Sequence, residues 1–181
     1  MRLVVAFIAC IAIFMPLAYA QDAYLLNPGD QVFIEVWSEP DLQRNTIILP
    51  DGNISFPLAG QVNAAGLSLQ ELQDSIGARL ADYITNPVVT VSISEMAGNT
   101  IFVIGQVNAP GAFVMSGPMS ALQALSLSGG FTAFADTKRI KIIRKLANED
   151  QVLRVNYAEL SGGDDLESNH LLQSGDVLVV P

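Results

Sequence analysis

Short apolar runs interrupted by Gly, Pro, Asn and Asp make up most of the chain after residue 20. In the first run, Val32, Ile34 and Val36 alternate with other residues, a period of two that is typical of a strand with one buried face. A chain divided in this way predicts short strands rather than long helices. Further strands are expected at residues 46–49, 54–58, 89–93, 112–115, 140–143, 152–155 and 177–180.

Two segments carry the signals of a helix start. Residues 68–71 (SLQE) and 120–123 (SALQ) are capping boxes, in which two side chains satisfy free main-chain amides. The first helix should stop before Pro87, and the second, which is short, at Gly129-Gly130. Together with the strands, these helices predict the α+β class. One buried face of the first helix is expected to hold Leu69, Leu72, Ile76, Leu80 and Tyr83.

Turns rich in glycine connect these elements. Asp51-Gly52 between two apolar runs predicts a β-hairpin of residues 46–49 with 54–58. The segment GQVNAAG at residues 60–66 returns as GQVNAPG at 105–111. In each copy the first glycine is expected to permit close backbone approach, and the last to adopt a turn conformation. We interpret the copies as separate strand-to-turn junctions, because their distances to the following helix differ.

The N-terminus predicts export from the cytoplasm. Arg2 precedes an apolar run, and small residues at Ala18 and Ala20 are typical of a signal-peptidase site. Residues 1–20 are therefore predicted to be a signal peptide that is cleaved before Gln21. The only cysteine, Cys10, lies in that peptide, so the exported protein is expected to be soluble and free of disulfides.

Charge and residue content argue against several functions. Once the signal peptide with Arg2 is removed, eight basic residues remain against 18 acidic ones. The resulting net charge of −10 argues against nucleic acid as a partner. The chain has one histidine, His170, and no Walker, GxGxxG or GxSxG pattern. We therefore predict no catalytic, cofactor-binding or metal-binding residues, and interpret the acidic residues at 164–167 as solvated. A glycosidase-type pair of carboxylates stays open.

A basic cluster and the aromatic residues each allow two interpretations. The cluster is either a contact site for an anionic polymer or acidic partner, or the solvated face of a strand that buries Ile140 and Ile142. Aromatic side chains such as Trp37 can stack on sugar rings, but their place in strand patterns favours the core. The basic cluster consists of Lys138, Arg139, Lys141, Arg144 and Lys145.

The motifs, taken in order, carry a resemblance to a known family. The first half contains YLLNPGD at 24–30, DGNI at 51–54, PLAG at 57–60 and NPVVTV at 86–91. The second contains VIGQV at 103–107, SGGF at 128–131 and LQSGDV at 172–177. This set resembles the outer-membrane polysaccharide export proteins. The motif residues, interpreted as structural, are Pro28, Gly29, Asp30, Asp51, Gly52, Pro57, Gly60, Pro87, Gly105, Pro110, Gly111, Gly129, Gly130, Gly175 and Asp176.

The resemblance implies a domain order and a function. A small mixed sheet-plus-helix export domain would occupy residues 21–97, and a soluble-ligand-binding, β-grasp-like domain residues 98–181, in a short form without a C-terminal membrane helix. The implied role is non-enzymatic export of exopolysaccharide or capsular polysaccharide across the periplasm and outer membrane, without a cofactor. The protein would be a ring-forming homo-oligomer in the periplasm, associated with the outer membrane.

The implied partners are the polysaccharide, an inner-membrane polysaccharide co-polymerase and a separate outer-membrane β-barrel protein. Two alternatives from other classes stay open. The chain could be a monomeric periplasmic module that binds an oligosaccharide or another small ligand at a defined pocket. It could also be a cell-wall hydrolase, which would release soluble sugars through a carboxylate pair.

Overall fold

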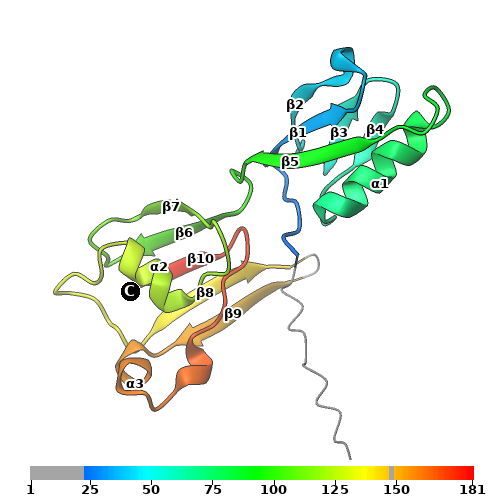
Figure 1. The fold of residues 1–181 in the computed structure, drawn as a ribbon. Helices are drawn as coiled ribbons and strands as arrows, with labels where there is room; N and C mark the ends of the chain where they lie inside the picture. Colours follow the sequence, from blue (N-terminus) through cyan, green and yellow to red (C-terminus); the bar gives the residue numbers. More distant parts are fainter. Residues whose placement is uncertain (1–22, 147–148) are drawn as a thin grey trace, which may run out of the picture.

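The computed structural model describes residues 23–146 and 149–181, which form two units joined near residue 98 (Figure 1). We call the elements from β1 to β5 the first unit and those from β6 to β10 the second unit. The predicted signal peptide at residues 1–20 lies outside the described residues. Within the described ranges, no helix is long and apolar enough to cross a membrane.

The first unit combines a three-stranded sheet, a hairpin and one helix. Strand β1 (Gln31–Val36) lies between β2 (Arg44–Ile47) and β5 (Val89–Glu95) and is antiparallel to both. Strands β3 (Asn53–Phe56) and β4 (Gly60–Asn63) form the hairpin. A 3-10 turn, η1 (Pro40–Leu42), follows β1, and helix α1 (Leu69–Leu80) packs against β5. The core includes Val32, Ile34, Val36, Ile54, Phe56, Leu72, Ile76 and Leu80.

The second unit is a five-stranded mixed sheet with helices against one face (Figure 1). The strands are β6 (Thr100–Gly105), β7 (Gly111–Val114), β8 (Ile140–Lys145), β9 (Asp150–Val155) and β10 (Val177–Val180). Their spatial order is β7-β6-β10-β8-β9, and only the β6–β10 pair is parallel. The helical segments are α2 (Ala121–Leu127), α3 (Tyr157–Gly162) and η2 (Leu166–Ser168).

Each unit has its own apolar core, and the α+β class is confirmed. The buried residues of the first core lie between Leu26 and Val91, and those of the second between Ile101 and Val180. A small sheet-plus-helix unit is thus followed by a mixed sheet with a central parallel pair. The domain bounds 21–97 and 98–181 stay predictions.

Both capping boxes are confirmed. The Ser68 side chain accepts a hydrogen bond from the Glu71 amide, and the Glu71 carboxylate accepts one from the Ser68 amide; this lowers the pKa of Glu71. Ser120 and Gln123 form the same reciprocal pair at the start of α2. Tyr83 was expected on the buried face of the first helix, which is wrong. It lies beyond the end of α1 and is exposed.

The predicted hairpin around Asp51-Gly52 is wrong. Strand β2 pairs with β1, whereas β3 pairs with β4 through the turn at residues 57–59. The turn at Asp51-Gly52 does form, with the Gly52 amide donating to the Leu49 carbonyl over 2.8 Å. The Gly52 carbonyl, however, accepts from the amides of Ala64 and Ala65, each over 2.9 Å. These long-range bonds hold the turn against the segment after β4. The turn therefore forms a corner between the three-stranded sheet and the β3–β4 hairpin.

The two glycine-rich copies differ in structure. In the first copy, residues 60–63 are strand β4 itself, and a Cβ at Gly60 would meet no atom within 4 Å, so the expected close approach there is wrong. In the second copy, Gly105 has a φ of +97°, and an added Cβ would overlap the Val180 carbonyl of the neighbouring strand. The close approach expected at Gly105 is confirmed. Gly111 lies in β7 without a positive φ, so the turn conformation expected there is wrong.

This difference predicts contrasting effects of alanine at two positions of one segment. Gly105→Ala should destabilise the second unit by at least about 2 kcal/mol, because it combines a left-handed backbone with a steric overlap on β10. Gly111→Ala is the matched control, and its unfolding free energy should change by no more than about 1 kcal/mol. Urea unfolding followed by circular dichroism measures both. Equal unfolding free energies of the two variants would contradict the proposed steric conflict between Gly105 and β10.

Candidate functional site

The carboxylate of Asp30 organises the junction between the two units. Asp30 is fully buried at the start of β1. Its Oδ2 accepts hydrogen bonds from the Tyr24 hydroxyl over 2.6 Å and the Asn27 amide over 2.8 Å, and its Oδ1 accepts from the Gly98 amide over 2.9 Å. Burial, together with the bond to this carboxylate, raises the pKa of Tyr24. One motif residue therefore binds the first unit to the connecting segment.

Gly98 connects this carboxylate to the second unit. Its carbonyl accepts a hydrogen bond from the Ser174 hydroxyl over 2.6 Å. An added Cβ would overlap the Pro28 carbonyl, so no side chain fits at this position. The backbone of a single residue thus contacts the turn before β1 and the turn before β10.

These two turns have the same local structure. In Pro28-Gly29-Asp30 and in Ser174-Gly175-Asp176, the glycine has a positive φ, 98° and 85° respectively, and the aspartate is buried. Asp176 Oδ2 accepts from the Gln173 amide over 2.9 Å, just as Asp30 accepts from the amide three residues before it. Both aspartates precede a core strand, so these motif residues build turns that start strands.

Arg144 of the basic cluster belongs to the second of these turns. Its Nε and Nη2 donate to the two carboxylate oxygens of Asp176 over 2.9 and 2.7 Å, and Nη2 also donates to the Leu171 carbonyl over 2.9 Å. The bond to Asp176 raises the pKa of Arg144. Its side chain is only 13% exposed. Arg144 therefore stabilises the turn before β10, a role that the sequence did not indicate.

The other four residues of the basic cluster are exposed. Arg139 forms an ion pair with Asp136 over 2.5 Å. Lys138, Arg139 and Lys141 line a hollow of about 230 Å³ together with Ile140 and Arg154. Sequence reasoning missed Arg154, which lies opposite Lys141 on the neighbouring strand β9. Contact of the four exposed residues with a polymer or partner stays a prediction.

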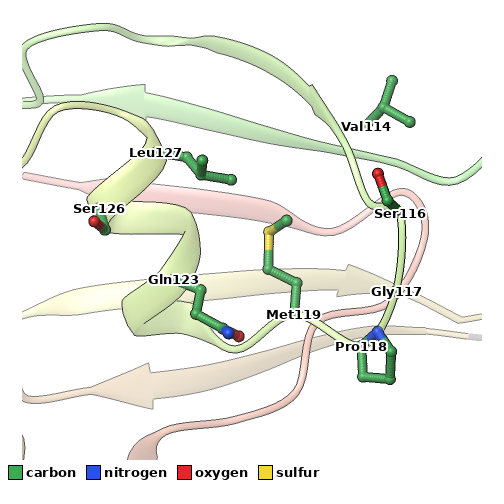
Figure 2. Close-up of a pocket in the computed structure, with 8 residues that line it drawn as sticks. All are labelled: Val114, Ser116, Gly117, Pro118, Met119, Gln123, Ser126 and Leu127. Carbon is green, nitrogen blue, oxygen red and sulfur yellow. The ribbon is translucent and has the colours of Figure 1, made fainter.

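Two larger hollows flank the loop at residues 116–118. One, of about 640 Å³, lies between the units and includes Tyr24, Asn27, Met96 and Leu172 in its lining. The other, of about 500 Å³, lies between that loop and α2, where Met119, Gln123 and Leu127 line it (Figure 2). All lining residues of both hollows are uncharged. Such surfaces offer weak apolar and hydrogen-bonding contacts rather than a charged binding site.

The described residues contain no cluster typical of a metal centre. Within residues 23–146 and 149–181, no three His, Cys, Asp or Glu side chains lie close enough together to hold a metal ion. The carboxylates at 164–167 belong to the segment around η2. The backbone amide of His170 donates to the Ser168 carbonyl over 2.9 Å.

The expectation that Trp37 lies in the core is wrong. Its side chain is 74% exposed. Val32, Ile34 and Val36 face the core, so the alternation of β1 places the next residue, Trp37, on the opposite face, just beyond the end of the strand. Trp37 remains attached to the sheet through its amide, which donates to the Val88 carbonyl over 2.9 Å. The first unit thus presents an aromatic ring to solvent.

The Asp30 contacts predict the effect of an isosteric substitution. Asp30→Asn should lower the unfolding free energy of the first unit by about 1–3 kcal/mol, because an amide cannot accept the bonds at both former oxygens. Fluorescence of Trp37, the only tryptophan, and circular dichroism follow the unfolding. The exposed Asp41→Asn is the control and should have little effect. A D30N stability equal to that of D41N would contradict the proposed importance of this carboxylate.

Comparisons with known families cover almost the whole of this structure. Residues 18–94 match the model of the polysaccharide biosynthesis/export protein family. Residues 99–180 match the model of the SLBB domain. The first match covers all elements of the first unit apart from the last residue of β5. The second match covers every strand and helix of the second unit. The order of the two matches is the order that the sequence motifs predict.

Several proteins that carry names are similar in sequence to this chain. It is 27% identical over 190 residues to the EPS I polysaccharide export outer membrane protein EpsA of Ralstonia nicotianae, an alignment that covers 91% of this chain and 49% of EpsA. It is 30% identical over 108 residues to the polysialic acid transport protein KpsD of Escherichia coli, covering 59% of this chain and 19% of KpsD. The exopolysaccharide production protein ExoF of Rhizobium meliloti is 26% identical over 84 residues, covering 45% of this chain and 20% of ExoF.

The chain spans about half the length of the EpsA proteins that it matches. The two family models nevertheless match consecutive parts of it, and both parts fold as separate units with separate cores. The chain therefore contains a polysaccharide biosynthesis/export domain followed by an SLBB domain.

Proposed function

We propose that this protein takes part in the export of exopolysaccharide or capsular polysaccharide across the periplasm and outer membrane. The observation that carries the proposal is the ordered pair of domain matches, in a chain whose relatives include proteins named for polysaccharide export and polysialic acid transport. The role is non-enzymatic: the protein holds and guides a polymer that other proteins make.

The surfaces described above support this proposal. A translocation path must hold a hydrated polymer weakly at many points, and the uncharged hollows beside residues 116–118 are shallow surfaces of that kind. The exposed Trp37 ring adds an apolar platform on which a sugar ring can stack. We place the protein in the periplasm, at the outer membrane, as a homo-oligomer that works with an inner-membrane polysaccharide co-polymerase.

Deletion of the gene tests the proposed function. Surface polysaccharide should fall to background in the deletion strain while polymer synthesis inside the cell continues, because export and synthesis are separate steps. Fluorescent lectin or antibody labelling of whole cells measures the surface polymer, and total carbohydrate in cell lysates measures synthesis. A plasmid copy of the unaltered gene should restore the surface signal.

Two outcomes contradict the proposal. Normal surface polysaccharide in the deletion strain would show that export does not need this protein. Release of soluble sugars from cell-wall or capsular polymer by the purified chain, abolished by changing one carboxylate, would instead show that it is a hydrolase.

A further inference from the structure

One face of the five-stranded sheet carries apolar side chains although no described element packs on it. Successive side chains of a strand point to opposite faces of the sheet. Ile101 and Val103 of β6, Ile140 and Ile142 of β8 and Leu178 and Val180 of β10 are buried in the core beneath α2. Their neighbours along each strand therefore point away from α2. We call this second set the outer sheet face: Phe102, Ile104, Lys141, Ile143, Val152, Arg154, Val177 and Val179.

Strand register aligns these side chains in two rows. Phe102 lies opposite Val177, Val177 opposite Ile143, and Ile143 opposite Val152, which gives an apolar row across four strands. The second row runs in the same way through Ile104, Val179, Lys141 and Arg154, and is apolar at one end and basic at the other. The exposed fractions are 44% for Phe102, 46% for Ile104, 36% for Ile143 and 54% for Val152.

The sheet of the first unit provides an internal comparison. On its face opposite the core, Asn45 and Ser92 flank Phe33, and Thr90 lies opposite Glu35. The Ser94 hydroxyl donates to the Asn45 side chain over 2.7 Å on the same sheet. This is the mainly polar surface expected of a sheet face in water. The outer sheet face lacks that polar character, and contiguous exposed apolar surface marks an interaction site.

The basic end of the outer sheet face lacks a counter-charge. Lys141 and Arg154 lie directly opposite each other, an arrangement that destabilises a strand pair when both side chains carry the same charge. Two ion pairs occur among residues 23–146 and 149–181, Arg139 with Asp136 and Arg144 with Asp176, and neither includes Lys141 or Arg154. The hollow of about 230 Å³ at this end is lined by both side chains. A carboxylate placed there would relieve the repulsion.

The combination of an apolar row and two cations fits a protein surface better than a hydrated polymer, which would cover the cations but leave the apolar row in contact with water. The protein itself has acidic surface in excess, with 18 acidic and nine basic residues. One acidic segment, residues 159–167, contains Glu159, Asp164, Asp165 and Glu167 beside the exposed Leu166. Leu160 of α3 packs in the core beneath the sheet, so this segment lies on the side away from the outer sheet face.

Symmetric contact between two outer sheet faces is disfavoured, because it would bring the cations of both copies together. Contact between the outer sheet face of one copy and the acidic segment of another pairs opposite charges and covers apolar side chains on both. Such a contact joins different patches of the two copies, and it can therefore repeat from copy to copy and close into a ring.

We propose that the outer sheet face of the second unit binds the acidic segment 159–167 of another copy of this chain. The proposal rests on the proposed function in so far as that includes a homo-oligomer, and it names the surfaces that join the copies. Lys141 and Arg154 receive carboxylates of the acidic segment, while Phe102, Ile143 and Val152 cover Leu166.

Charge reversal on each surface tests the pairing. The purified chain is examined by analytical ultracentrifugation over a range of concentrations. K141E/R154E and D164K/D165K should each weaken self-association by roughly tenfold or more, since each places like charges together. An equimolar mixture of the two variants should associate at least as strongly as the unaltered chain, because each supplies the surface that matches the other's reversed charges. Arg44→Glu, on an edge strand of the first unit, is the control and should change little.

Cysteine crosslinking checks the same contact without relying on charge. In the chain that begins at Gln21, which contains no cysteine, V152C and L166C variants are mixed and oxidised. A disulfide-linked dimer should form in the mixture and hardly at all with either variant alone. The I47C chain mixed with L166C is the control, because Ile47 is a similarly exposed residue of an edge strand in the first unit.

Several outcomes would overturn the proposal. These are a chain that stays monomeric at every concentration, association unaffected by both charge reversals, failure of the mixture to restore association, or crosslinks equal to the I47C control. A different result would identify a polymer site instead. In that case the K141E/R154E chain would still self-associate but would lose binding to immobilised alginate, an anionic polysaccharide. These measurements are independent of the surface polysaccharide of the deletion strain. They therefore test the contact between copies, and the deletion strain tests the proposed function.

Discussion

The buried carboxylate of Asp30 is the contact on which the arrangement of the chain depends. A carboxylate taken out of water is tolerated only when hydrogen bonds replace its hydration. Three donors do so here, and they come from the segment before β1, from the turn itself and from the segment that connects the two units. The same carboxylate therefore determines how β1 enters its sheet and where the second unit begins. Asp176 has the equivalent position at β10, with Arg144 as its principal partner.

Local signals predicted much of the fold. The serines at 68 and 120 start helices because their side chains satisfy main-chain amides within the next turn, an interaction that needs no distant partner. The alternation in residues 31–36 and the apolar run at 177–180 predicted strands for similar reasons. The two-domain order could also be inferred, because each motif occupies a short, continuous stretch of sequence.

Features that depend on distant segments could not be predicted in this way. Asp51-Gly52 has the residues of a hairpin turn, yet the amides of Ala64 and Ala65 bind the Gly52 carbonyl and make it a corner. Arg144 is one of five neighbouring basic residues in the sequence, and it differs from the others by its low exposure and by its bonds to Asp176 and Leu171, which come from a distant segment. The pairing of Lys141 with Arg154 follows from the register of two strands. Alternation did predict Val36 as buried, but not that the strand would end before Trp37.

The position of β10 has a consequence for how the protein is made. This strand occupies the centre of its sheet, between β6 and β8, although it is the last element in the sequence. A chain released N-terminus first can complete the first unit once β5 has emerged, but β6 and β8 then lack their central neighbour. Their unpaired edges could join foreign strands until residues 177–180 arrive. The second unit is therefore the part of the nascent chain most exposed to misassembly, until residues 177–180 have emerged and paired with β6 and β8.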